Sequence, residues 1–115
     1  MIICKRVYDE AHKDDGYRIL VDRLWPRGIK KSDLLHDEWN KTLAPSTALR
    51  KAFHSEAIDY NEFTRRYREE LSAQQDELRI VADRARNGKV TLLFGAKNSE
   101  QNHARVLADV LKEMK

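Results

Sequence analysis

The sequence of 115 residues is poor in the groups that mark secreted, metal-binding and membrane proteins. It has a single cysteine, Cys4, so no disulfide can form within the chain, and a reducing compartment is expected. No CxxC or HxxxH pair occurs, which argues against a metal site. No apolar run approaches the roughly 20 residues that a membrane-spanning helix needs. Residues 1–6 turn charged too early for a signal peptide. We therefore expect a cytoplasmic protein.

Glycine and proline are also scarce, with four and two residues, and the glycine-rich phosphate loops are absent. Neither GxGxxG nor GxxxxGK[ST] occurs, so dinucleotide binding and P-loop nucleotide chemistry are poorly supported. The Gly-x-Ser-x-Gly elbow of serine hydrolases is missing as well. No cofactor is indicated.

Charge and apolar content favour one folded domain over residues 1–115. Charged residues make up 36% of the chain and apolar residues 41%, which is not the composition of a disordered protein. A chain of this length can bury a core of its own. The formal net charge of +3 permits an anionic partner without requiring one.

Short apolar runs alternate with segments of helical periodicity. Strands are expected at residues 2–7, 17–22 and 89–94, with a weak edge strand at 35–39. Helices are expected at 47–53, over 59–87 as one long helix or two, and after an N-cap at Asn98, with Gln101 at the capping-box spacing. This order predicts an α/β fold: a single three-layer domain with a small, mostly parallel sheet of three or four strands and helices on both faces.

Polar and basic residues follow two of the predicted strands. Arg23 and Arg27 come after the second strand, and Gly95, Lys97 and Asn98 come after the last one. In open parallel sheets, ligands bind beyond the carboxyl ends of the strands. Arginines grip carboxylate or phosphate, glycine allows close approach to the backbone, and a helix N-terminus offers free N–H groups. The sequence therefore predicts a basic cleft that binds a small anionic or phosphate-containing ligand, with hydrolysis or group transfer left open.

Three further side chains are candidates for this cleft. His103, near the start of the last helix, and Asp22, at the end of the second strand, are the candidates for moving protons. Trp25 could contact a ligand, although a lid over the sheet end is the more ordinary role of such a residue.

Two other functions stay open. The basic loop with Arg27, Lys30 and Lys31 could contact the phosphate backbone of a nucleic acid. An exposed apolar patch around Trp25 would instead favour a non-catalytic protein-interaction or regulatory domain. The sequence does not establish whether the protein is an enzyme, and it does not indicate an oligomeric state.

The chain resembles the YeaO-like bacterial proteins, a family catalogued as domain of unknown function 488. The resemblance covers nearly the whole chain and rests on residues 4–9, 16–28, 37–39, 43–46, 49–51 and 91–104, with Trp-Pro-Arg-Gly at 25–28 as its most specific part. It implies a small cytoplasmic α/β protein, and it adds weight to Arg23, Arg27 and His103. Wider members carry cysteines near the last strand and a Cys-His-Arg after it. Here Phe94 and Asn102-His103-Ala104 stand in those places, so a thiol chemistry is not expected.

Overall fold

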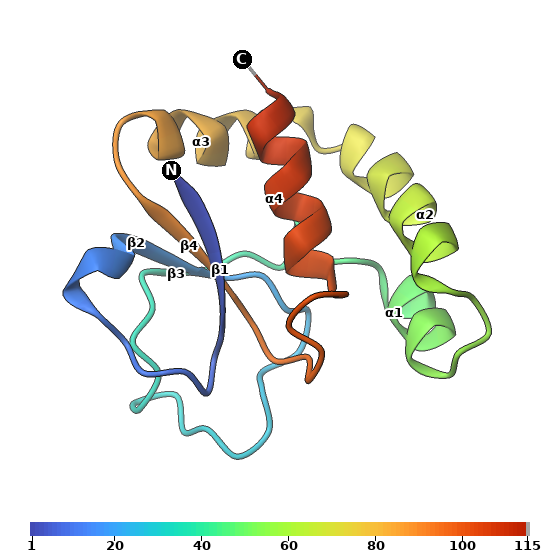
Figure 1. Cartoon of the computed structure of the whole chain (residues 1–115), viewed down its shortest axis with the longest axis horizontal. Helices are drawn as coiled ribbons and strands as arrows, with labels where there is room; N and C mark the ends of the chain where they lie inside the picture. The colour runs from blue at the N-terminus through green and yellow to red at the C-terminus, as the bar shows by residue number, and fades with distance from the viewer. Residues whose placement is uncertain (115) are drawn as a thin grey trace.

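A computed structural model describes residues 1–114 and contains a sheet, four α-helices and a short 3-10 turn. Figure 1 shows their arrangement. The strands are β1 (Ile2–Arg6), β2 (Tyr17–Leu20), β3 (Glu38–Trp39) and β4 (Val90–Phe94); the helices are α1 (Thr47–His54), α2 (Tyr60–Ser72), α3 (Gln75–Arg86) and α4 (His103–Glu113); the turn is η1 (Lys13–Asp15). Among these residues, no helix has both the length and the apolar character that crossing a membrane requires.

The sheet is parallel throughout, with the strand order β1-β4-β2-β3. The central strand β4 pairs with β1 on one side and β2 on the other, and all five of its residues are buried. A strand covered on both faces has a continuous apolar sequence instead of an alternating one. The predicted α/β class and the parallel sheet are therefore confirmed, and so is the weak edge strand, shortened to β3.

All four α-helices contribute to one large apolar cluster on a single face of the sheet. That cluster takes Ile2, Ile19, Val90, Leu92 and Phe94 from the sheet. From the helices it takes Leu49 of α1, Phe63, Tyr67 and Leu71 of α2, Leu78, Val81, Ala82 and Ala85 of α3, and Ala104, Val106, Leu107, Ala108 and Leu111 of α4. The last helix lies against β1 and β4, and α2 and α3 pack beside it. Each helix places its apolar side chains at a spacing of three or four, which is why one face of each can be buried.

The opposite face of the sheet differs from the expectation of a second helical layer. Leu20 and Leu93 point to this side and form a smaller cluster with Val7, Leu34, Trp25, Ile29 and Trp39. In the described chain, Val7 after β1, η1 and the connection between β2 and β3 cover this face, and no α-helix contributes to its apolar cluster. Parallel strands are usually joined through a helix, but Pro26 and Gly28 interrupt this crossover. A folded loop therefore takes the place of the helix.

Local capping explains where the helices begin. Side-chain oxygens of Ser46 and Asp59 accept the N–H groups of Leu49 and Glu62 at the starts of α1 and α2. The long periodic segment divides into α2 and α3 at residues 73–74. The predicted N-cap at Asn98 is wrong, since α4 begins at His103 with Asn102 as its N-cap. Asn98 instead uses its side-chain oxygen to accept the N–H groups of Glu100 and Gln101 in the preceding loop.

A buried ionic network holds η1 to the sheet on the loop-covered face. Asp15 is 3% exposed, forms ion pairs with Lys5 and Arg18, and accepts the N–H of His12. The Thr91 hydroxyl in β4 donates to the Asp15 carbonyl at 2.6 Å. Burial opposes ionisation of Asp15, but the His12 N–H and the two cations together hold its pKa below the usual range.

Replacing Gly16 with alanine is expected to destabilise the fold by about 3 kcal/mol. Gly16 has φ +67°, and an added Cβ would lie 2.2 Å from the Lys89 carbonyl oxygen, which also accepts the Tyr17 N–H. Gly28 has φ +78° but open space around it, so Gly28→Ala should cost only about 1 kcal/mol. Urea unfolding of both variants measures the difference. Equal losses would show that the close approach at Gly16 is relieved at no cost.

The Asp15 network should make stability depend on pH in the acid range. The folded-state pKa of Asp15 is lowered, so its stabilisation is complete above the unfolded-state pKa of about 3.9 and is lost as the pH falls through the folded-state value. Asp15→Asn should therefore destabilise the protein strongly at pH 7, by about 3 kcal/mol, because Lys5 and Arg18 lose their counter-charge. The gap between variant and wild type should narrow below pH 4 in denaturant titrations. A gap that stays constant with pH would contradict this.

Candidate functional site

Asp22, the second residue after β2, lies at the carboxyl edge of the sheet and joins three segments there. One carboxylate oxygen, Oδ2, accepts the Gly95 N–H at 2.9 Å, and the other, Oδ1, lies 2.8 Å from Nε2 of His103. Its backbone carbonyl accepts the indole N–H of Trp39 at 2.7 Å. Gly95 and His103 mark the two ends of the loop between β4 and α4. We call this arrangement the Asp22 clamp, because one carboxylate holds both ends of that loop.

The clamp depends on the absence of a side chain at Gly95. An added Cβ there would lie 2.9 Å from Asp22 Oδ2 and 3.7 Å from Pro26 Cβ. The sequence predicted that the missing side chain at Gly95 would let a ligand approach the backbone. In the structure the carboxylate of Asp22 and the ring of Pro26 occupy it.

His103 is the first residue of α4 and is nearly buried. The side chains of His103 and Asp22 are 14% and 16% exposed, and the facing atoms, Nε2 and Oδ1, have no well-aligned hydrogen bond despite their contact. The ring meets Phe94 edge-on. The sequence named His103 and Asp22 as separate candidates for moving protons, and the structure places the two side chains in contact. A role in proton transfer stays a prediction.

Asn102 fixes the position of His103. It is 1% exposed, its side-chain oxygen accepts the Arg105 N–H, and its side-chain N–H donates to the Asn98 carbonyl. The Tyr60 hydroxyl donates to the Asn102 carbonyl at 3.2 Å. The start of α4 is therefore tied both to its own loop and to α2.

Arg23 faces away from solvent into the turn before α1. Its Nε donates to the Pro45 carbonyl at 2.9 Å, and its terminal nitrogen lies 3.4 Å from the Ala44 carbonyl. Next to this turn, Ser46 donates its N–H and its hydroxyl to Glu70 of α2. These contacts give Arg23 a structural role, and its binding role stays a prediction.

Three basic residues lie on segments that contact one another beyond the carboxyl ends of β1, β2 and β4. Arg27 and Lys97, both predicted site residues, are exposed, and Arg6 is the last residue of β1. The Tyr8 hydroxyl donates to the Arg27 carbonyl at 2.8 Å, and the Arg6 guanidinium lies 4.9 Å from the centre of the Tyr8 ring. Nε of Arg6 donates to the Ala96 carbonyl, beside Lys97. We call Arg6, Arg27 and Lys97 the basic rim.

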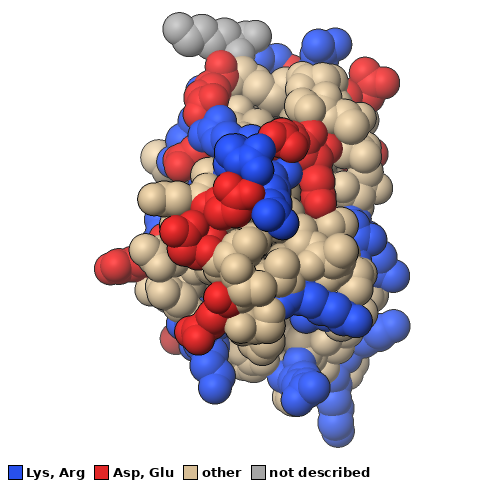
Figure 2. Space-filling model, turned by 90° about the vertical axis from the view of Figure 1, so that its right-hand side faces the viewer, with Lys and Arg blue, Asp and Glu red and all other residues tan. Residues whose placement is uncertain are grey.

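No carboxylate in residues 1–114 lies within ion-pair distance of the basic rim. Asp9 accepts the backbone N–H of Arg6 but does not pair with its guanidinium. Figure 2 shows acidic and basic side chains intermixed over the upper part of one face, whereas Lys and Arg predominate toward the lower end. In Figure 1 the strands also end toward the lower side. The sequence reasoning missed Arg6 and Tyr8, although the strand-end rule that selected Arg23 and Lys97 applies equally to the end of β1.

Trp25 belongs to the loop-covered face more than to an open cleft. Its ring packs edge-on against Trp39 and His36, and its indole N–H donates to the Ile29 carbonyl at 2.6 Å. Nζ of Lys31 lies 5.9 Å from the centres of both tryptophan rings. Contact of Trp25 with a ligand stays a prediction.

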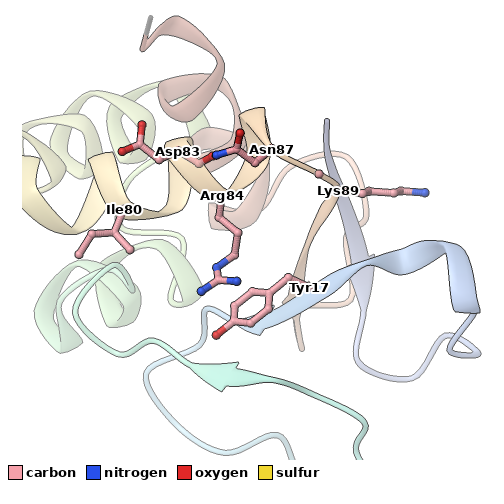
Figure 3. A pocket seen from close by; sticks show the side chains of 7 residues that line it. Tyr17, Ile80, Asp83, Arg84, Asn87 and Lys89 are labelled. Atoms are coloured by element: carbon pink, nitrogen blue, oxygen red, sulfur yellow. The ribbon is translucent and has the colours of Figure 1, made fainter.

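Away from the carboxyl edge, the structure offers a hollow and no cluster of metal ligands in residues 1–114. Within residues 1–114, no group of three or more His, Cys, Asp or Glu side chains is placed to hold a metal ion. A hollow of about 460 Å³ lies at the opposite end of the sheet from the Asp22 clamp, lined by Tyr17, Ile80, Asp83, Arg84, Asn87, Gly88 and Lys89. Figure 3 shows its lining.

Fold and site together define a small parallel α/β protein with a basic carboxyl edge and a buried Asp–His contact. The chain belongs to the DUF488 family: a family model described as "Inactive DUF488-N3 subclade" matches residues 1–115. It is 58% identical to the uncharacterized protein YeaO of Escherichia coli K12 over 113 residues, covering 98% of both chains. It is 43% identical over 108 residues to the uncharacterized proteins Mb3100c of Mycobacterium bovis and Rv3073c of Mycobacterium tuberculosis, covering 92% of this chain and 89% of theirs. No solved structure gives a significant match.

The Asp22 clamp leads to a graded prediction for two substitutions. Asp22→Asn keeps an oxygen for the Gly95 N–H but removes the charge beside His103, and should destabilise by about 1 kcal/mol. Asp22→Ala removes both contacts and leaves the Gly95 N–H without its acceptor, and should cost about 3 kcal/mol. Chemical denaturation measures both. Asp33→Asn, an exposed position in the same connection, is the matched control and should stay within about 0.5 kcal/mol of wild type. An alanine variant as stable as this control would disprove the clamp.

Proposed function

We propose that this protein binds a small phosphate-containing anion at the basic rim and does so without catalysis. The observation that carries the proposal is that Arg6, Arg27 and Lys97 lie on neighbouring segments beyond the sheet, linked through Tyr8 and Ala96, and form no ion pair in residues 1–114. The Arg6 Nε–H donates to Ala96, but the terminal nitrogens of Arg6 and the side chains of Arg27 and Lys97 have no side-chain hydrogen bond in residues 1–114 and can donate to a ligand. An arginine pair with a nearby lysine suits phosphate oxygens, which accept several donors at once.

Tyr8 supports the proposed site by holding two members of the rim. Its ring lies under the Arg6 guanidinium, and its hydroxyl is bonded to the backbone of Arg27. The cation–π contact restricts Arg6 without using its hydrogen-bond donors. Less side-chain freedom then has to be lost when an anion binds, which favours affinity.

We assign the Asp22–His103 contact to positioning the loop that carries Lys97. Asp22 accepts the Gly95 N–H and contacts His103, so both side chains are engaged with each other or with the backbone. This contact holds the loop after β4 to the start of α4, next to the N-cap Asn102. The description of the subclade as inactive supports binding over hydrolysis or group transfer. We accordingly expect no phosphate release from p-nitrophenyl phosphate or pyrophosphate.

Nucleic-acid binding through Arg27, Lys30 and Lys31 is a weaker alternative. Single-stranded nucleic acids stack bases on free aromatic faces. In this loop the tryptophan rings pack on each other, and lysines approach them, with Lys41 Nζ 4.1 Å from the centre of the Trp39 ring.

A cytoplasmic location stays a prediction.

Isothermal titration with inorganic phosphate and pyrophosphate tests the proposal. Pyrophosphate should bind more tightly than phosphate, because it reaches more of the rim. The Arg27→Ala/Lys97→Ala double variant should bind at least about tenfold more weakly, since it loses two charge-assisted contacts. Lys112→Ala, which removes an exposed charge near the far end of α4, is the matched control and should bind like wild type.

Two results would contradict anion binding at the rim. One is an affinity for pyrophosphate that the double variant and the Lys112→Ala control lose equally. The other is binding to oligonucleotides alone, with an affinity that falls steeply as salt rises, which would favour the nucleic-acid alternative.

A further inference from the structure

A second candidate site lies at the amino end of the sheet, separate from the basic rim. The hollow of about 460 Å³ is bounded by the C-terminal half of α3, the first residue of β2 and the turn that leads into β4. It opens to solvent along α3, where Ile80 and Arg84 lie one turn apart (Figure 3). Its volume is in the range of small-molecule sites.

Arg84 supplies the principal charge of this hollow. Its guanidinium carbon lies 3.7 Å from the centre of the Tyr17 ring, so the cation is stacked on an aromatic face. Figure 3 shows the side chain reaching from α3 toward that ring. In residues 1–114 the guanidinium makes no ion pair and no side-chain hydrogen bond. The stack therefore orients Arg84 while leaving its planar fork of N–H donors free.

A hydrogen bond to β3 holds the Tyr17 side chain in place. Its hydroxyl donates to Glu38 at 3.0 Å, and Glu38 also accepts the side-chain N–H of Asn40. Burial, and then the contact with Glu38, raise the pKa of Tyr17, so the phenol stays protonated at neutral pH. The ring is thus a rigid neutral platform for Arg84.

The acidic groups near the hollow are engaged elsewhere. Asp83 of the lining pairs with Arg86, and Glu38 is held by Tyr17 and Asn40. Lys89 adds a second cation to the lining. Ile80 is 58% exposed and is the apolar member of the set. Cationic donors beside an exposed aliphatic surface suit a ligand with one acidic end and one apolar end.

We propose that the hollow between α3 and β2 binds a small organic carboxylate, with the carboxylate on Arg84 and its apolar part on Ile80. A planar carboxylate matches the guanidinium in a two-bond contact. The two sites differ in chemistry, since the basic rim carries several cations, whereas the hollow pairs one stacked arginine with an exposed aliphatic side chain.

Benzoate is the probe for this site, followed by ¹H–¹⁵N NMR of the whole chain. Benzoate should shift the amides of Tyr17, Arg84 and residues 87–89, and its ring protons should show contacts to the Ile80 methyl groups. Arg84→Ala should weaken benzoate binding by at least about tenfold, as loss of a charge-assisted pair implies. Arg84→Lys should recover only part of the affinity, because it keeps the charge and loses the planar fork.

Two controls separate this site from general charge effects and from the rim. Arg79→Ala removes an exposed charge of α3 outside the lining and should leave benzoate binding unchanged. Ile80→Ser should weaken benzoate but not acetate. Amide dispersion in each spectrum verifies that the variants are folded. No shifts at these amides up to 50-fold excess of benzoate over the roughly millimolar protein, or equal affinity in Arg84→Ala, would overturn the proposal.

Discussion

The carboxylate of Asp22 is the interaction on which the carboxyl edge of this protein depends. A buried carboxylate is costly unless its oxygens have partners, and here the partners come from distant parts of the chain. Gly95 follows β4, His103 begins α4, and Trp39 of β3 is held by the carbonyl of the same aspartate. One residue after β2 therefore fixes the loop after β4, the start of the last helix and the edge strand. The position of Lys97 on the surface is a result of these contacts.

Much of this arrangement follows from residue patterns. Continuous apolar runs predict the strands, and the rule that parallel strands end at one edge of a sheet predicts that Asp22 and the start of the last helix lie close together. The start of α4 was misplaced because Asn98 and Asn102 are both capping residues, and residues 98–101 match the capping-box spacing. Contacts remote in sequence decide between them: Tyr60 of α2 bonds the carbonyl of Asn102.

Other features depended on information that the sequence pattern does not carry. A continuously apolar strand indicates that both faces of the sheet are covered, but it does not indicate what covers them. A loop buries Leu20 and Leu93 as completely as a helix would, so the pattern does not predict that the helices lie on one face. Arg6 was overlooked because the segment after β1 is acidic, with Asp9 and Glu10 close by. Its role depends on Tyr8 folding back beneath it, and such a contact has no periodic signature.

The two faces of the sheet differ in how much apolar surface they bury, because a loop and not a helix covers the second face. The helical side has twenty buried apolar residues in one cluster, whereas the cluster on the loop side has four and is bordered by a strand of two residues. Segments with few buried contacts open more readily than the global unfolding transition. Transient opening of residues 24–39 would uncover Leu20 and Leu93 while Val21, Asp22 and the helices stay packed, so the β2–β3 edge is where this fold first exposes its sheet to water.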